Sequence, residues 1–351
     1  MKCIQYTAVT VLLGIMFVSA QAVAQTQYTI RDLGVLRGGS ARVHGINNKG
    51  QVVGGSGFVY GADRHAFLFS NGPLRDLQRF SGGDISEAFA INDAGTVVGA
   101  SNTAVSTAAF TWTSAAGLRM LPLLPGTNAS QAFGENQLGD VVGISGTHAA
   151  LWSGATVTDL GVLPGGDWSE AHGINDQHQI VGYSSSSAGN HAVLWNQGQI
   201  LDLGVLSGDD SSRANLINAQ GIAIGASEGG NGVHAFMWSA STGLQALPSL
   251  SADDYTEAFG INSSGQIVGI SGDSLGTRAV IWLPSQGAVD LNNLIQDGPP
   301  TLVLTGAFAI NDAGQIVAFG INESEIGKNQ LTQSDRNMHH AGTRAFLLTP
   351  H

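Results

Sequence analysis

The sequence contains a single cysteine, Cys3, at the start of the chain. It precedes an apolar run from Ile4 to Val18, which follows the basic Lys2 and leads to a small-residue stretch, Ala22 to Ala24. This order is typical of a secretory signal peptide, and we predict cleavage after Ala24. The mature chain would then hold no thiol, which excludes disulfides, thiolate metal sites and a cysteine nucleophile.

A retained membrane anchor is the alternative for this segment. It would need about 20 consecutive apolar residues, and Thr7, Thr10 and Gly14 leave the run short and interrupted. A lipoprotein would need a cysteine just after the run, where the sequence has Ala22 to Gln25. We therefore expect a secreted or periplasmic protein with no membrane span after signal cleavage.

Positive charge is also scarce. Lysine and arginine number 14 against 26 aspartates and glutamates, and cleavage of the signal peptide would remove Lys2 and no acid. A nucleic-acid binder needs a basic surface, so nucleic acid is excluded as a partner. Only 11% of the residues are charged, whereas 43% are apolar and 49 are glycine, a composition that suits short buried strands joined by tight turns.

Known catalytic motifs are missing as well. The chain has no His-Glu-x-x-His and no phosphate-binding Gly-x-x-x-x-Gly-Lys. Gly-x-Ser-x-Gly occurs at Gly225 to Gly229 and at Gly272 to Gly276, where the repeat predicts the end of a strand rather than a nucleophile elbow.

What the sequence has in abundance is a repeat. The segment VHGINNKGQVVG (Val43 to Gly54) returns with small changes along the chain, for example as AFGINSSGQIVG (Ala258 to Gly269). A shared asparagine marks seven copies: Asn47, Asn92, Asn136, Asn175, Asn218, Asn262 and Asn311. A fixed period of this kind decides the architecture.

Each copy predicts two hairpins. In the first, Ile-Asn-x-x-Gly joins two apolar strands, because glycine supplies a positive φ and asparagine bonds its own backbone. His178 replaces this glycine in the fourth copy, so we expect a left-handed histidine there. In the second hairpin, an aromatic strand such as His65 to Phe69 returns as an Asp-Leu-Gly strand.

Four short strands in about 40–50 residues are the pattern of a β-propeller blade. We predict an all-β, seven-bladed β-propeller with four-stranded blades, formed as a single domain by residues 25–351. The last copy lacks a return strand, and Tyr28 to Leu36 (YTIRDLGVL) is a spare one at the front. It should pair into the last blade and close the ring, which removes free sheet edges. The alternative folds are a β-solenoid and a pair of β-sandwiches. Neither would explain why the last copy lacks a return strand while a spare strand stands at the N-terminus.

These residues resemble the HAF-repeat family of probable extracellular repeat proteins, which is named for the tripeptide seen at His65 to Phe67 and His234 to Phe236. The resemblance covers nearly all of the mature chain. It implies little about activity, because the family is defined by its repeat. Arginine replaces the family histidine at Arg278 and Arg344, and a polar insertion at 322–342 enlarges the last repeat.

The repeated histidines and tryptophans are expected to be structural. His65, His148, His191 and His234 would lie one per blade, too far apart to share a metal ion, and a bond to a neighbouring blade's turn is expected instead. Tryptophans at the end of the aromatic strands are expected to pack between blades rather than to stack on sugars: Trp112, Trp152, Trp195, Trp238 and Trp282.

The loops that differ between copies are the candidate site, since function on repeat scaffolds tends to lie in such loops. They lead from the Asp-Leu-Gly strand to the next inner strand and are expected at the mouth of a central channel. The candidate ligand-binding residues are Arg42, His44, Asp84, Glu87, Asp167, Trp168, Glu170, His172, Asp209, Asp210, Arg213, Asp253, Asp254, Tyr255 and Glu257. An acidic mouth with aromatic edges suits a cation, a sugar or a basic peptide; alternatively, these acids only cap turns.

Two functions follow from these residues. The first is a non-catalytic binding or structural protein, expected to be a monomer, that holds an extracellular polymer or protein ligand at the mouth. The second is a polysaccharide hydrolase or lyase that pairs Glu170 with Asp210 or Glu257, with one raised pKa. We favour the first, because seven similar copies carry no distinctive catalytic motif. No cofactor is expected, with structural calcium in the acidic loops as the alternative.

Overall fold

The computed structural model describes residues 26–36, 40–57, 63–251, 255–273, 276–284, 286–322 and 344–351. The predicted signal peptide and all but the first residue of the predicted insertion lie outside these ranges. Within them, every regular element is a β-strand except a short 3-10 helix, η1 (Leu291–Leu294). The described residues include no helix that is long and apolar enough to span a membrane.

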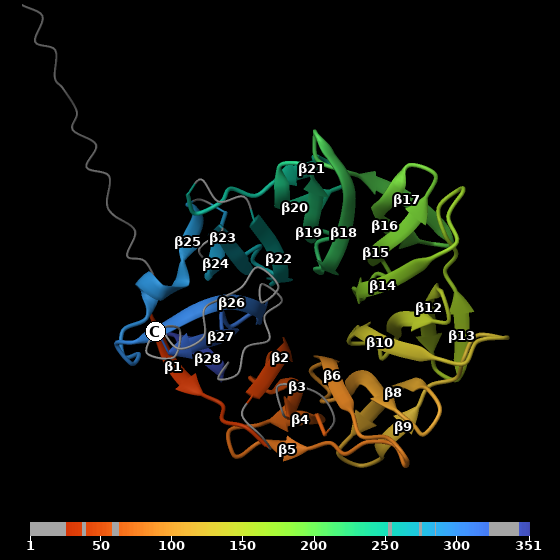
Figure 1. The fold of residues 1–351 in the computed structure, drawn as a ribbon, viewed down its shortest axis with the longest axis horizontal. Helices are drawn as coiled ribbons and strands as arrows, with labels where there is room; N and C mark the ends of the chain where they lie inside the picture. Colours follow the sequence, from red (N-terminus) through yellow and green to blue (C-terminus); the bar gives the residue numbers. More distant parts are fainter. Residues whose placement is uncertain are drawn as a thin grey trace, which may run out of the picture.

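The strands form antiparallel sheets that are arranged around a common centre (Figure 1). The innermost strands are β2 (Ser40–Ile46), β6 (Ser86–Ile91), β10 (Ser130–Glu135), β14 (Ser169–Ile174), β18 (Asp209–Ile217), β22 (Tyr255–Ile261) and β26 (Leu302–Ile310). The second strands are β3 (Val52–Gly57), β7 (Val97–Asn102), β11 (Val141–Ser145), β15 (Ile180–Ser186), β19 (Ala223–Gly229), β23 (Ile267–Asp273) and β27 (Ile316–Asn322).

The remaining strands lie farther from the centre (Figure 1). The third strands are β4 (His65–Phe69), β8 (Thr107–Thr113), β12 (His148–Ser153), β16 (Gly189–Asn196), β20 (Gly232–Ser239), β24 (Gly276–Leu283) and β28 (Arg344–Pro350). The outermost strands are β5 (Arg75–Asp76), β9 (Gly117–Met120), β13 (Thr156–Asp159), β17 (Gln199–Gly204), β21 (Gly243–Ala246), β25 (Gly287–Asp290) and β1 (Tyr28–Asp32).

Strands that follow one another in the chain pair as hairpins, as the repeat predicted. Five sheets have four strands each, and β18 to β25 are joined into an eight-stranded sheet. The junction is a single parallel bridge between Val233 in β20 and Tyr255 in β22. The all-β class and the four-stranded antiparallel sheets predicted from the sequence are therefore confirmed.

The first and last strands of the described chain lie in one sheet. β1 pairs antiparallel with β28, from Tyr28 opposite Pro350 to Asp32 opposite Phe346. Arg344 of β28 also forms an ion pair with Asp32, with 2.6 Å between Nη2 and Oδ2.

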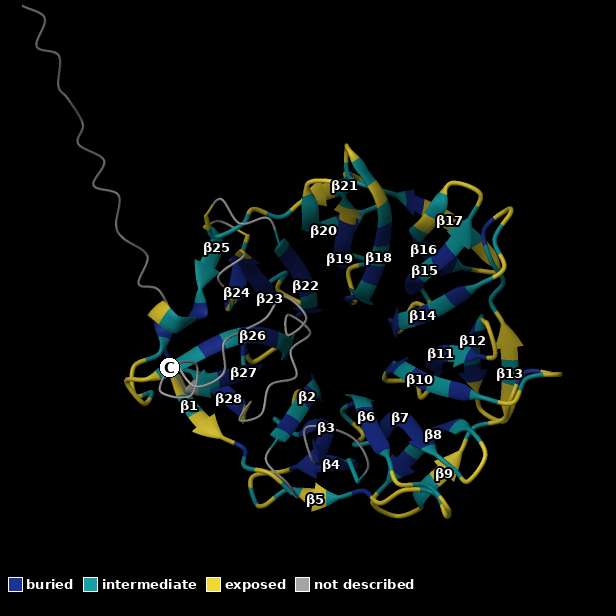
Figure 2. Cartoon of the chain, viewed as in Figure 1, coloured by how far each residue is buried: buried dark blue, intermediate teal, exposed yellow. Residues whose placement is uncertain are grey.

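Hydrophobic clusters fill the spaces between neighbouring sheets, while exposed positions gather on the outermost strands and loops (Figure 2). One cluster joins the last sheet to the first, where Leu33, Phe319 and Leu347 pack with Val43 and Phe67. The five tryptophans predicted to pack between sheets are at most 8% exposed and lie in such clusters. Their packing role is confirmed.

The first hairpin of each copy turns as predicted. Asn47 Oδ1 accepts hydrogen bonds from the backbone N–H of Lys49 (3.1 Å) and Gln51 (2.9 Å), and Gly50 has a φ of 72°. His178 has a φ of 59°, which confirms the predicted left-handed histidine.

The same asparagines also link the sheets, which the sequence did not reveal. Asn47 Nδ2 donates to the backbone carbonyl of Asn92 in the next copy, 2.9 Å away. Equivalent bonds of 3.0–3.3 Å run from Asn92 to Asn136, Asn136 to Asn175, Asn175 to Asn218, Asn218 to Asn262, Asn262 to Asn311, and Asn311 back to Asn47. The bonds form a closed cycle through all seven copies.

Candidate functional site

Every inner strand has a β-bulge at the same position of the repeat. In β2 the pairing shifts between Val43 and Gly45, which leaves His44 as the extra residue. A bulge re-aims the side chain of the extra residue. We call the seven bulged residues the belt: His44, Phe89, Phe133, His172, Asn215, Phe259 and Phe308. All of them are partly exposed, although they lie on the innermost strands.

The belt side chains contact one another across sheet boundaries. The ring centroids of His44 and Phe89 lie 5.2 Å apart, those of Phe89 and Phe133 5.3 Å, and those of Phe133 and His172 5.0 Å with nearly parallel planes. Phe259 and Phe308 stack in the same way, at 4.8 Å. The centre is therefore lined on much of its circumference by aromatic faces.

Charged residues lie two positions before the belt, nearer the loops that were predicted to form the mouth. Glu257 binds Arg213 through two hydrogen bonds, from Nε (2.9 Å) and Nη2 (2.7 Å). It also accepts hydrogen bonds from Asn215 Nδ2 (3.1 Å) and the Tyr255 hydroxyl (3.1 Å). Burial alone would lower the pKa of Arg213, but the charge and hydrogen bonds of Glu257 hold it above its usual value.

Glu87 forms a second charged cluster. Its Oε1 lies 2.7 Å from His44 Nε2, and its Oε2 lies 2.7 Å from Arg64 Nε. Burial alone would raise the pKa of Glu87, but the hydrogen bond from His44 and the charges of Arg64 and Arg42 hold it below its usual value. Burial also lowers the pKa of Arg42, against the opposing charge of Glu87.

Glu170 forms the third cluster, with aromatic neighbours. Its Oε2 accepts a hydrogen bond from the Tyr183 hydroxyl (3.3 Å), and His172 Nε2 lies 3.2 Å from its Oε1. Trp168 meets Tyr183 edge to face, with centroids 4.8 Å apart. Burial and the charge of Glu170 raise the pKa of Tyr183, which keeps its hydroxyl protonated as a donor.

The structure thus brings nine predicted residues into three clusters: Arg42, His44 and Glu87; Trp168, Glu170 and His172; and Arg213, Tyr255 and Glu257. Glu257 is engaged by Arg213, and Asp210 is exposed on β18. The pairing of Glu170 with either acid stays a prediction.

Three of the other predicted acids contact polar side chains. The carboxylate of Asp84 contacts the Asn102 side-chain amide, and that of Asp167 accepts a hydrogen bond from the Ser185 hydroxyl (3.3 Å). Asp209 lies 3.3 Å from His234 Nδ1, with its side chain almost fully buried. In each case the contact is to a side chain, so the capping alternative stays a prediction for these three. Asp253 and Asp254 lie outside the described residues.

Sequence reasoning missed several residues of the clusters and the belt. Arg64 and Tyr183 come from the second hairpin and the second strand, not from the mouth loops. The missed belt residues are Phe89, Phe133, Asn215, Phe259 and Phe308. A signal was present, because the position before Gly-Ile-Asn or its equivalent is aromatic in every copy except the fifth.

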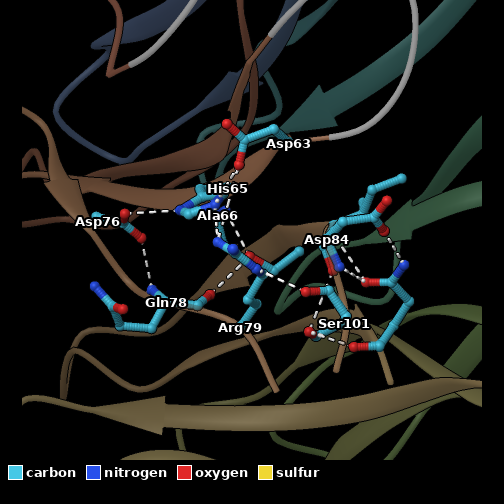
Figure 3. Close-up of polar contacts among 12 residues, drawn as sticks. Asp63, His65, Ala66, Asp76, Gln78, Arg79, Asp84 and Ser101 are labelled. Atoms are coloured by element: carbon cyan, nitrogen blue, oxygen red, sulfur yellow. Dashed lines mark hydrogen bonds and ion pairs between the residues drawn. The ribbon is translucent and has the colours of Figure 1, made fainter. Parts of the chain in front are cut away.

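The repeated histidines bind an aspartate of their own sheet. His65 Nδ1 lies 2.7 Å from Asp76 Oδ2, and Asp63 and Arg79 contact its other nitrogen (Figure 3). His148 with Asp159 and His191 with Asp202 repeat the pairing, at 2.7 and 2.9 Å.

These pairs explain the Asp-Leu-Gly motif. In its turn, one aspartate oxygen accepts the backbone N–H two residues later, as Asp159 does from Gly161 (2.8 Å), while the histidine holds the other oxygen. We expected a structural bond to a neighbouring sheet's turn; the bond is structural, but the partner lies in the same sheet. Among the described residues, no three histidine, aspartate or glutamate side chains converge in a way that could hold a metal ion.

Comparison with known proteins identifies the fold. No protein-family model matches the sequence, and no curated protein matches it. Among solved structures, the chain is similar to a streptogramin B lyase, with a TM-score of 0.55, 9% identity, and coverage of 93% of this chain and 98% of the other. It is also similar to a virginiamycin B lyase from Staphylococcus aureus, with a TM-score of 0.57, 9% identity, and coverage of 92% and 99%. At this identity the likeness concerns the fold alone, and it is that of a β-propeller.

Proposed function

We propose that this chain is a secreted or periplasmic, non-catalytic binding protein of the HAF-repeat type. Its fold would be a seven-bladed propeller closed by its N-terminal strand. The pairing of β1 with β28 and the asparagine cycle through seven copies support this closure. The ligand, an extracellular polymer or protein, would bind at the mouth of the centre, between the charged clusters and the belt.

The observation that carries the proposal is the partly exposed aromatic belt beneath the charged clusters. A ligand that reached it would meet ring faces such as Phe133, stacked on His172, together with carboxylate, guanidinium and hydroxyl groups above. Binding sites combine apolar and aromatic walls with a few placed polar groups in this way.

The engagement of the acids favours binding over hydrolysis. Glu257 accepts four hydrogen bonds, two of them from Arg213. Glu87 is contacted by His44 and Arg64, and its pKa is lowered rather than raised. A general acid needs a raised pKa, so these two carboxylates suit the anchoring of a rigid wall.

The test is binding of the purified mature chain to an array of polysaccharides, cell-wall fragments and secreted proteins, with product release measured in the same wells. Phe133→Ala removes a central face of the belt, and Thr158→Ala, an exposed change on the outermost strand β13 of the same sheet, is the control. Binding without product release, weakened by Phe133→Ala alone, supports the proposal. Product release that Glu170→Gln abolishes would make the protein an enzyme, and the absence of any binding would also overturn the proposal.

Secretion is tested separately. Expressed in a Gram-negative host, the full chain should be found outside the cytoplasm with its first residue at Gln25, as measured by mass spectrometry. A cytoplasmic chain that keeps its first 24 residues would contradict the prediction.

A further inference from the structure

The glutamates of the three clusters, Glu87, Glu170 and Glu257, differ in how their charge is compensated. Glu87 lies 2.7 Å from an arginine nitrogen of Arg64, and Glu257 is bound by Arg213. Glu170 has no lysine or arginine within ion-pair distance among the residues that the structure describes. Among the three cluster glutamates, Glu170 is the one whose described ion-pair contact is a histidine, His172, and not an arginine.

The two oxygens of Glu170 also differ in their hydrogen bonds. Oε2 accepts the Tyr183 hydroxyl, but no described residue donates a hydrogen bond to Oε1. His172 Nε2 lies 3.2 Å from Oε1, yet it is a buried nitrogen without a hydrogen-bond partner. Buried polar atoms in native proteins are mostly paired, so an unpaired nitrogen beside a half-paired carboxylate points to a missing partner.

The walls around this oxygen are aromatic. The Tyr183 ring centroid lies 5.4 Å from that of His172 and 4.8 Å from that of Trp168, and Phe133 stacks on the His172 ring. Aromatic faces attract cations through their negative π surface, most strongly where water is partly excluded. A carboxylate oxygen among such faces is matched by a compact group that carries positive charge and several N–H donors.

We propose that Trp168, Glu170, His172 and Tyr183 form a subsite for the ammonium group of an organic amine. The inference rests on the proposed binding function and names the chemistry of its ligand. The ammonium would donate to Glu170 Oε1 and lie against the Tyr183 and Trp168 rings. The partly buried side chain of Glu170, 15% exposed, would then gain the cation that Glu87 and Glu257 already have.

The experiment compares matched probes by calorimetry on the mature chain, at a pH below the pKa of the amines. The probes are glucosamine and its oligomers, N-acetylglucosamine and its oligomers, and the sugar-free diamine cadaverine. Acetylation removes the positive charge of the amine and keeps the sugar. Glucosamine and its oligomers should therefore bind with a Kd at least about tenfold lower than that of the matching N-acetylglucosamine probes. Cadaverine shows whether the amine suffices, or whether the sugar ring is also needed.

Glu170→Gln should remove this preference and weaken amine binding about tenfold. Asp297→Asn is the matched control, since it removes one negative charge at an exposed position outside the clusters. If Glu170→Gln does not fold, as judged by circular dichroism, Trp168→Leu provides the same readout through the aromatic wall. Equal affinity for amine and acetylated probes, or an unchanged preference in the variant, overturns the subsite.

The two proposals fail in different ways. Suppose that a ligand from the array binds with an affinity that Glu170→Gln does not change, and that amines are not preferred over acetylated probes. This result would contradict the subsite and remain consistent with the proposed binding function. No binding of any array member or probe would overturn both proposals.

Discussion

Asn311 donates a hydrogen bond from its side-chain Nδ2 to the backbone carbonyl of Asn47, 3.0 Å away and 264 residues earlier in the chain. This bond joins the last copy of the repeat to the first. Asn311 is only 4% exposed, and its Oδ1 also accepts the backbone N–H of Gln315 (2.9 Å), so a single side chain stabilises a turn and an inter-sheet contact together.

Replacing Asn311 should therefore be costly. Asn311→Ala removes the turn and inter-sheet bonds and leaves the Asn47 carbonyl without this donor, so we expect a loss of about 2–3 kcal/mol in the free energy of unfolding. Urea denaturation measures it. Asn311→Asp keeps the turn acceptor but loses the donor, and should also destabilise. Asn128→Ala, at an exposed position, should change little. Equal stability of the Asn128 and Asn311 variants would contradict the role of the cycle.

A second set of inter-sheet bonds lies one residue further on and is incomplete. The backbone N–H of Gln137 donates to Asp176 Oδ1 (2.9 Å), and that of Asp312 donates to Asn48 Oδ1 (2.9 Å). The equivalent residue in the fifth copy is Ala219, which has no side-chain acceptor.

Ala219→Asn should supply the missing bond to the backbone N–H of Asp176. The position is exposed, so we expect a gain of about 0.5–1 kcal/mol, measured as a rise in Tm and in the urea midpoint. Ala219→Leu, which offers no acceptor, is the control. A gain shared by both variants would show that the effect is not the hydrogen bond.

Glu135 stands where the other six copies have isoleucine. Its Oε1 accepts the backbone N–H of Asn92 (3.1 Å), whereas its Oε2 is buried without a hydrogen-bond partner. Burial raises the pKa of Glu135 well above its usual value, and the bond from Asn92 offsets this only in part.

Because the folded-state pKa is raised, the contribution of Glu135 to stability is fully present below the unfolded pKa. It is lost as the pH rises through the folded pKa. Glu135→Gln should therefore be more stable than the wild type at neutral and alkaline pH, by on the order of 1–2 kcal/mol, with little difference in acid. Urea unfolding of both proteins across this range measures it. A difference that does not vary with pH would rule out this ionisation as the cause.

Glu87 should produce the opposite dependence. Its pKa is lowered in the folded state, so its stabilising contribution is present above the unfolded pKa and is lost as the pH falls through the folded pKa. Arg64→Leu removes one of the charges that lower it, which should raise the pKa of Glu87 and shift this loss to higher pH. The pH dependence of urea unfolding measures the shift. Arg119→Leu, at an exposed site, should leave the profile unchanged.

Much of the fold could be predicted from local patterns. The turn at His178 and the burial of Trp152 follow from the repeat, because a hairpin needs a positive φ and a strand of period two buries alternate residues. The bulge at His44 could not be predicted in this way. Strict alternation would put Arg42, His44 and Ile46 on the same face of β2. In the structure the pairing with β3 shifts at this point, so His44 is an extra residue without a partner residue in β3.

The candidate site was predicted only in part for the same reason. The acids that lead into the inner strands were found, and Glu87, Glu170 and Glu257 lie on the innermost strands β6, β14 and β22. Their partners were not, since Arg64 reaches Glu87 from a different hairpin and Tyr183 reaches Glu170 from the second strand. Such contacts depend on the packing of sheets and leave no spacing in the sequence.

The sequence by itself determined the all-β class, the number of repeats and the hairpin turns. Because the single cysteine, Cys3, precedes the predicted cleavage site, the sequence also excluded thiol chemistry in the predicted mature chain. These follow from local propensity and period. Only the tertiary structure decided that Arg213 neutralises Glu257, 44 residues away, while Glu170 has no arginine partner among the residues that the structure describes. Whether a charge is compensated depends on a few ångströms between neighbouring sheets, and that distance is set by side-chain packing between copies rather than by the pattern within one.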